Sequence, residues 1–168
     1  MKAEPVRLAE LLAALSLATD LGMGQPSGHA VQTCVLSVRL ARDLQLPDDQ
    51  VSEVFYVALL RYLGCTADAS EVARLAGDEI DLAQTVGPYV MGDVVDRVSH
   101  SDVPDPEQAM ATAMAIHCEA AGMLGSRLGP GERVTAALGH GFERWDGKGH
   151  PSGLASEDVP LPIRISVL

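Results

Sequence analysis

The sequence predicts an all-α protein, folded as a helical bundle with a closing loop rich in glycine and proline. Three observations predict it: apolar residues recur at helical spacing, glycine and proline fall between the apolar segments, and the alternation typical of strands is sparse. With 168 residues, 47% of them hydrophobic, the chain is long enough to bury the core of one domain. We therefore expect a single domain over residues 1–168.

The first two helices are expected over residues 6–21 and 28–44. Each carries an apolar stripe at helical spacing, and these stripes are expected to be buried. Their members are Leu8, Leu11, Leu12 and Leu15 in the first helix and Val31, Cys34, Val35 and Val38 in the second. Ser27 is expected to cap the second helix, because its hydroxyl can accept a hydrogen bond from a first-turn amide.

The next two helices have signals at both ends. Pro47, followed by two aspartates, opens a third helix, since proline needs no amide hydrogen there and acids suit the positive end of the helix dipole. This helix is expected to run to residue 63 and to end at Gly64. Asp68 and Glu71 have the spacing of a capping box for a short fourth helix, which Gly77 ends.

Three further helices are expected in the second half of the chain, over residues 88–98, 106–128 and 131–142, before a final apolar segment, LPIRISVL. The longest of them has an apolar face. Its members are Met110, Ala113, Met114, His117, Ala120, Ala121 and Leu124.

The closing loop, FERWDGKGHPSGLASEDVPLP, occupies residues 142–162. Its glycines permit positive φ and its prolines fix turns. Trp145 is expected to bury a large area, while Glu143, Arg144 and Asp146 pair locally. The loop is expected to fold back over the helices as a structural clasp.

Charge and cysteine content exclude several classes of function. The chain has 12 basic and 23 acidic residues, a formal net charge of −11, and so has no broad basic surface for nucleic acid. Its three cysteines are odd in number and lack C-x-x-C spacing, which argues against a disulfide framework or a thiolate zinc site. Because it shows neither a signal peptide nor a membrane-spanning apolar run, we expect a cytoplasmic protein without membrane or nucleic-acid contacts.

The stretch FERWDGKGHPSGLASEDVPLPIRI resembles the C-terminal signature of HD-GYP domains. These are bacterial relatives of HD-type metal phosphohydrolases and usually hydrolyse cyclic di-GMP. A weaker likeness extends upstream, where Gly28 and His29 match a Gly-His pair and VALLRYLGC takes the place of the His-Asp segment. The resemblance implies an HD-domain-like helical bundle. The signature loop comprises Glu143, Arg144, Trp145, Asp146, Gly147, Gly149, His150 and Pro151, with the last three in place of Gly-Tyr-Pro.

Departures from the family pattern fall on the positions that the resemblance assigns to metal ligands. Arg61 and Tyr62 stand in place of the adjacent His and Asp, and Gly141 and Phe142 in place of paired histidines. A guanidinium does not deprotonate in proteins and cannot ligate a cation. The resemblance therefore implies a degenerate active site with no catalytic residue and no cofactor.

Three histidines of the pattern remain, namely His29, His117 and His140. With a carboxylate from Glu143 or Asp146 they could hold one divalent metal, iron, manganese or zinc, to activate water and neutralise phosphate. A structural interpretation is favoured for each: a first-turn residue at His29, a buried and hydrogen-bonded histidine at His117, and a helix-end cation at His140.

These observations favour a catalytically degenerate sensory or regulatory domain of a bacterial signalling or transcription regulator. It resembles regions found ahead of LuxR-type helix-turn-helix modules, and because LPIRISVL stops directly after the signature, we expect a domain cut from, or truncated relative to, a longer protein. The alternatives are a divergent metal-dependent phosphohydrolase similar to cyclic dinucleotide phosphodiesterases, and a homodimerising interaction module. The expected partners are a small-molecule or nucleotide ligand, or a second copy of the chain.

Overall fold

The computed structural model describes residues 7–22, 25–77 and 104–167. Within these ranges the regular elements are helices, and the only β-type pairing is two isolated bridges in the closing loop, so the all-α prediction is confirmed. The helices are α1 (Leu8–Gly22), α2 (His29–Asp43), α3 (Asp48–Leu60), α4 (Cys65–Ala76), α7 (Pro106–Leu128), α8 (Glu132–Leu138), the 3-10 helix η1 (Ser156–Asp158) and α9 (Leu161–Ser166). The helix expected over residues 88–98 lies outside the described residues.

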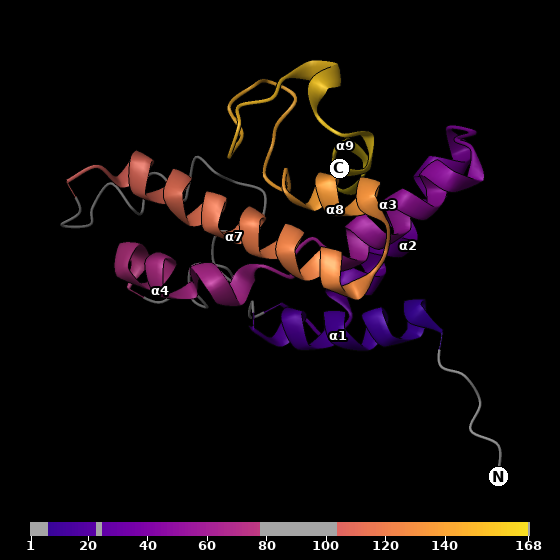
Figure 1. Ribbon diagram of the computed structural model, residues 1–168, viewed down its shortest axis with the longest axis horizontal. Coiled ribbons are helices and arrows are strands. Elements are labelled where there is room, and N and C mark those ends of the chain that lie inside the picture. The colour runs from indigo at the N-terminus through magenta and orange to yellow at the C-terminus, as the bar shows by residue number, and fades with distance from the viewer. Residues whose placement is uncertain (1–6, 23–24, 78–103, 168) are drawn as a thin grey trace, which may run out of the picture.

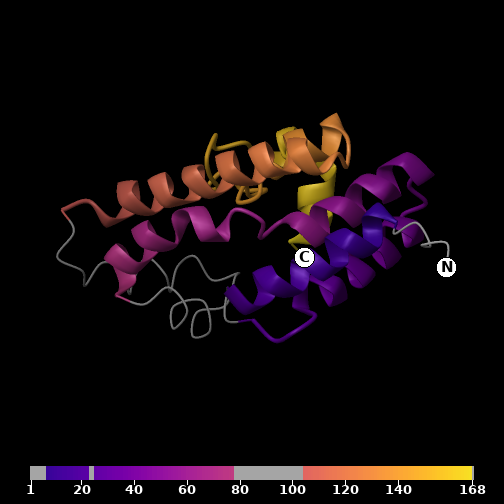
Figure 2. The ribbon, with the colours of Figure 1, turned by 60° about the horizontal axis from the view of Figure 1, so that its bottom comes forward.

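Helix α3 lies at the centre of the bundle. It packs against α2 and α9 most extensively and also against α1 and α8, while α4 and α7 pack against each other along their lengths (Figures 1 and 2). The loop that follows α8 lies on the opposite side of α7 from α1 (Figure 1). The turn between α3 and α4 therefore joins the central helix to the α4–α7 pair.

The main core forms where α3 meets its neighbours. Val57, Ala58, Leu59 and Leu60 are all buried, because partners lie on several sides of this helix. Leu12, Leu138 and Ile163 bring apolar contacts from α1, α8 and α9 to the same cluster. No helix among the described residues is both long and apolar enough to cross a membrane.

The predicted stripes of the first two helices are correct only in part. Leu12 and Cys34 are buried, but Leu11 and Val35 are exposed. Helical spacing predicts which side of a helix is apolar, but it does not predict how much of that side is buried. Among the described elements, α1 has packing partners on one side only. Each exposed residue follows or precedes a buried stripe member by one position, which rotates it by about 100° to the edge of the stripe.

Helix α2 is not capped by Ser27, contrary to the prediction. Its cap residue is Gly28, and the carboxylate of Asp20, in the preceding helix, accepts hydrogen bonds from the backbone amides of Gly28 at 2.9 Å and Ala30 at 3.1 Å. Asp20 is buried, so this carboxylate satisfies first-turn amides that water does not reach.

The boundary between α3 and α4 also differs from the prediction. Helix α3 ends at Leu60, a turn occupies residues 61–64, and α4 begins at Cys65. The capping box is wrong, since Asp68 lies inside α4 and bonds to another helix, while Glu71 pairs with Arg74. The ends at Gly77 and Gly129 are confirmed, both with positive φ. The helix expected over residues 131–142 is shorter and ends at Leu138.

The contact of Gly64 with α7 leaves no room for a side chain. A Cβ at this position would overlap the backbone carbonyl oxygen of His117, although the φ of −83° suits any residue. We therefore expect Gly64→Ala to lower the free energy of unfolding by ~3 kcal/mol through overpacking alone. Urea unfolding followed by circular dichroism measures this change.

The matched control is Gly122→Ala in α7, where an added Cβ would lie at an ordinary contact distance of 3.7 Å from the Thr135 carbonyl oxygen. This variant is expected to be as stable as the parent or more stable, by up to ~1 kcal/mol, because alanine favours helix. Equal effects of the two substitutions would contradict the proposed close contact.

Candidate functional site

His117, one of the predicted site residues, lies in α7 and is 1% exposed. Its Nδ1 is 3.1 Å from Asp68 Oδ2, and its Nε2 is 3.0 Å from the backbone oxygen of Arg61. The ring of Phe142 meets the imidazole at 68° with a centroid separation of 4.7 Å. The side chain thus contacts α4, the turn after α3, and the segment after α8.

Arg61 is buried, with 5% of its surface exposed. Its Nη1 donates a long hydrogen bond of 3.4 Å to the backbone oxygen of Ser166, and its guanidinium lies 5.4 Å from the ring centroid of Tyr62. Tyr62 is also buried, and its ring lies 6.2 Å from that of His29. The structure therefore places a cation, and not a metal ligand, inside the bundle at this position.

His140 follows the last helical turn of α8. Its backbone amide donates to Ala137 at 2.9 Å, as expected for a residue at a helix end. Its Nδ1 lies 3.8 Å from Glu143 Oε1, which is an ion-pair distance and too long for a hydrogen bond. The neighbouring Gly141 is buried against α7, where an added Cβ would lie 3.9 Å from Cys118 Sγ.

Glu143 holds the closing loop. Its side chain is almost fully buried, and its two carboxylate oxygens accept hydrogen bonds from the backbone amides of Ser152 at 2.6 Å and Leu154 at 2.8 Å. The backbone amide of His150 donates to the Phe142 oxygen at 3.1 Å. One carboxylate therefore accepts hydrogen bonds from two amides that lie outside regular secondary structure, and it joins the start of the loop to its middle.

The position of Trp145 in the loop differs from the prediction. This side chain is 58% exposed, and the guanidinium of Arg164 from α9 lies 5.7 Å from its ring centroid. The large predicted burial is wrong, because the ring lies over an arginine at the surface and not over the core. Arg144 donates to Asp146 at 2.9 and 2.7 Å, and this pair, with the Lys148 amide, holds the pKa of Asp146 well below its usual range.

The loop glycines serve two purposes. Gly147 and Gly153 have φ of 73° and 67°, the left-handed region that side chains disfavour. Gly149 has no positive φ, but a Cβ there would overlap the backbone of Arg144 and Glu143. Pro151 follows His150 through a cis peptide bond.

The described residues do not fit the metal centre that the resemblance implies. Both ring nitrogens of His117 already have partners within the protein, and Glu143 and Asp146 are each bonded to other groups of the loop. No three His, Cys, Asp or Glu side chains in the described ranges are grouped so that they could hold a metal ion. Assignment of His29, His117 and His140 as ligands of one metal remains a prediction.

Sequence reasoning missed the partners of these residues. Asp68 and His117 are 49 positions apart, and Asp68 had the spacing of a capping residue, which concealed its contact with α7. The amide contacts of Glu143 had no sequence signal beyond a carboxylate next to glycines and prolines. Only the path of the chain brings these groups together.

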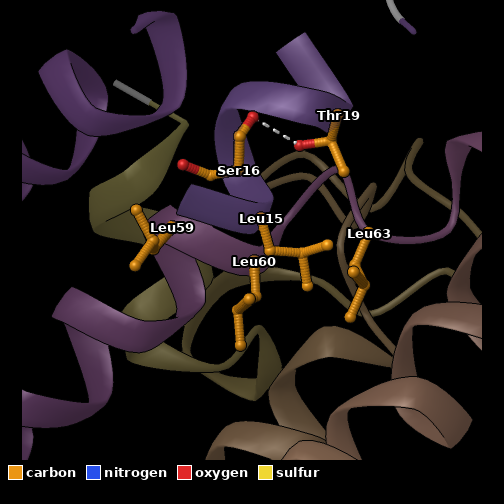
Figure 3. Close-up of a pocket in the computed structure, with 6 residues that line it drawn as sticks. All are labelled: Leu15, Ser16, Thr19, Leu59, Leu60 and Leu63. Atoms are coloured by element: carbon orange, nitrogen blue, oxygen red, sulfur yellow. Dashed lines mark hydrogen bonds between the residues drawn. The ribbon is translucent and has the colours of Figure 1, made fainter. Parts of the chain in front are cut away.

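A small recess in the described part of the chain lies away from these residues. Leu15, Ser16 and Thr19 of α1 face Leu59, Leu60 and Leu63 across a small apolar recess with an empty volume of about 130 Å³ (Figure 3). The Thr19 hydroxyl donates to the Ser16 carbonyl at 2.8 Å, so it is satisfied within its own helix. None of the candidate site residues lines this recess.

Comparison with known proteins gives two curated relatives. The chain is 24% identical over 180 aligned positions to the 3′3′-cGAMP-specific phosphodiesterase 3 of Vibrio cholerae, with 96% of this chain and 39% of the relative covered. It is 26% identical over 147 positions to a cyclic di-GMP phosphodiesterase of Pseudomonas aeruginosa, with 83% and 28% covered. The chain thus spans less than two fifths of the length of either relative. No family model matches.

Among solved structures, a cyclic GMP-AMP-specific phosphodiesterase of V. cholerae superposes with a TM-score of 0.69 at 20% identity, over 95% of this chain and 38% of that one. This similarity confirms the helical fold expected from the signature loop. The two sequence relatives are both named as cyclic dinucleotide phosphodiesterases, which agrees with the resemblance that the signature loop suggested.

Removal of the Glu143 charge should weaken the loop. In Glu143→Gln, one oxygen still accepts an amide hydrogen bond, but the new NH₂ group faces a second amide donor. We expect the free energy of unfolding to fall by ~1–3 kcal/mol, the cost of a buried unsatisfied group. Urea unfolding measures it, and fluorescence of Trp145, the single tryptophan, reports the loop.

Glu157→Gln, an exposed carboxylate in η1 of the same loop, is the control and should change stability by less than ~0.5 kcal/mol. If Glu143→Gln and Glu157→Gln were equally mild, the amide contacts of Glu143 would not hold the loop.

The cysteines should be unreactive in the folded protein. Cys34, Cys65 and Cys118 are free and buried, and burial raises the pKa of each thiol, to about 11 for Cys34. Because the thiolate is the reactive form, alkylation by iodoacetamide at pH 8 is expected to be at least ~10-fold slower in the native protein than in urea. Mass spectrometry of the labelled protein measures it, and rapid native labelling of any of the three would show that its burial is wrong.

Proposed function

We propose that this chain is a non-catalytic relative of cyclic dinucleotide phosphodiesterases, which acts by binding within a bacterial signalling or transcription regulator. The observation that carries the proposal is the buried Arg61, whose guanidinium occupies the bundle where the resemblance requires a His-Asp metal pair. A cation at this position repels the metal ions that hydrolysis by such a centre requires.

Retention of the loop supports a role other than hydrolysis. Its shape depends on amide contacts of Glu143 and on the Gly149 backbone contact, neither of which needs a metal. A binding domain can keep this architecture after its ligands for metal are lost. We propose a nucleotide or another small phosphate-bearing molecule as the ligand, because both curated relatives are named for cyclic dinucleotide substrates.

The regulatory setting belongs to the same proposal. The net charge of −11 disfavours contact between this domain and DNA, so any DNA contact of a LuxR-type regulator would come from another module. We place the domain in the cytoplasm, where such regulators and their nucleotide signals meet.

A metal-dependent phosphodiesterase is the second candidate, and the names of the two relatives favour it. It would require His29, His117 and His140 to act with Glu143 or Asp146 on one ion of iron, manganese or zinc. Such a site needs His117 to leave Asp68 or the Arg61 carbonyl, and needs one carboxylate to leave its loop partners.

Exposed leucines favour a homodimer as a third candidate. Leu21 of α1 and Leu36 of α2 are largely exposed, although each lies on a helix that packs against the bundle on its other side. Light scattering over a range of concentrations measures the mass, and a monomer at high concentration speaks against a dimer.

Metal content and turnover decide between the first two candidates. Protein purified without chelator is expected to hold substoichiometric iron, manganese and zinc by elemental analysis, and to leave cyclic di-GMP and 3′3′-cGAMP intact when each metal is added. The V. cholerae 3′3′-cGAMP-specific phosphodiesterase, assayed in parallel, is the positive control. Stoichiometric metal together with cleavage of either dinucleotide would establish the enzyme and refute the proposal.

Calorimetric titration of the same two dinucleotides, without added metal, tests the ligand class. Saturable binding that is not followed by cleavage is the expected result, and absence of heat for both would exclude cyclic dinucleotides of this kind as ligands.

A further inference from the structure

The environment of His117 fixes the hydrogen on one of its two ring nitrogens. A backbone carbonyl can only accept, so the 3.0 Å contact between His117 Nε2 and the Arg61 oxygen requires a hydrogen on Nε2. The other ring nitrogen, Nδ1, shares a hydrogen with the Asp68 carboxyl group across 3.1 Å. Whichever of these two atoms carries it, neither ring nitrogen has a lone pair free for a metal ion.

The acceptor at Nε2 has a particular place in the fold. Arg61 is the C-cap residue of α3, and carbonyl groups at the end of a helix lack donors from a following turn. The helix dipole also places partial negative charge there, which favours a ring hydrogen directed at it. His117 therefore supplies from α7 what a following helical turn would have supplied to α3.

The contact joins α7 to a stretch that is distant in sequence and contains the end of α3 and the first turn of α4. His117 lies 56 positions from Arg61 and 49 from Asp68, and its backbone oxygen packs directly on Gly64 in the turn between α3 and α4. The ring is almost fully buried, with Phe142 against it. Loss of either hydrogen bond would leave a buried polar group without its partner.

From this geometry we infer that His117 is a structural cap, in place of the metal ligand that the family resemblance implies. It closes the C-terminus of α3 through Nε2, and through Nδ1 it fixes Asp68 and thus the start of α4. The inference concerns the assembly of the fold, and it holds whether or not the domain binds a nucleotide.

Nitrogen NMR of the ¹⁵N-labelled histidine ring at neutral pH tests the hydrogen positions directly. The Nε2 hydrogen of His117 is expected to appear as a slowly exchanging resonance, and addition of Zn²⁺ is expected to leave both ring nitrogens unshifted. A bare Nε2, or a stoichiometric shift of either ring nitrogen on addition of Zn²⁺, overturns the inference. This readout does not depend on nucleotide binding, so it can fail independently of the proposed function.

Substitution of Asp68 tests the link to α4. Asp68→Ala is expected to lower Tm by ~3–8 °C, a shift that corresponds to the loss of one or two kcal/mol in a chain of this size. Asp68→Asn should recover part of the loss, because its side-chain amide can still form a hydrogen bond with Nδ1. Amide hydrogen exchange should quicken in α4 and at the end of α3, and much less in α2.

Glu71→Ala is the matched control, since it removes a carboxylate of α4 whose partner, Arg74, is on the exposed surface of the same helix. Its Tm should change by less than ~2 °C. Equal losses in Asp68→Ala and Glu71→Ala would overturn the structural role of the Asp68–His117 contact. If Asp68→Ala does not fold, two other measurements test the structural role of the contact. They are the Tm of Asp68→Asn compared with that of Glu71→Gln, and the NMR spectrum of the wild-type protein.

Discussion

The hydrogen-bonded side chain of His117 is the contact on which the arrangement of the candidate site depends. It lies where α7 crosses the turn between α3 and α4, and its ring bonds to one group on each side of that turn. Gly64 allows the two backbones to meet, because any side chain there would occupy the space of the His117 carbonyl. The hydrogen bonds of the His117 ring and the close backbone contact at Gly64 lie at the same place. The ring therefore needs no metal to hold its orientation.

A second contact of the same kind holds the closing loop. Glu143 is a buried carboxylate whose charge is met by two backbone amides, and it joins the start of the loop to the residues after Pro151. Arg61 contributes a buried guanidinium that contacts Tyr62 and the end of α9. The carboxylate of Glu143, the guanidinium of Arg61 and the ring of His117 are thus each hydrogen-bonded to protein atoms, which offsets the cost of burying a polar group.

These contacts show which protein groups hold, in this chain, a fold that it shares with a cyclic GMP-AMP-specific phosphodiesterase. The signature loop resembles that of metal phosphohydrolases, but its turns depend on Gly147, Gly149 and Gly153 and on Glu143. Because these requirements are steric and hydrogen-bonding ones, they do not depend on a bound metal. The proposed function rests on these contacts together with the buried Arg61.

The sequence by itself determined the helical class, the long helix over residues 106–128 and the glycines at which α4 and α7 end. These depend on local spacing and on backbone freedom, which a short window of sequence contains. Only the tertiary structure decided that Asp68 faces His117 and that Asp20 caps α2, since each pairs residues from different helices. It alone also decided that Trp145 lies at the surface over Arg164. Burial and hydrogen-bond partners depend on which helices meet, and helical periodicity carries no information about the neighbour.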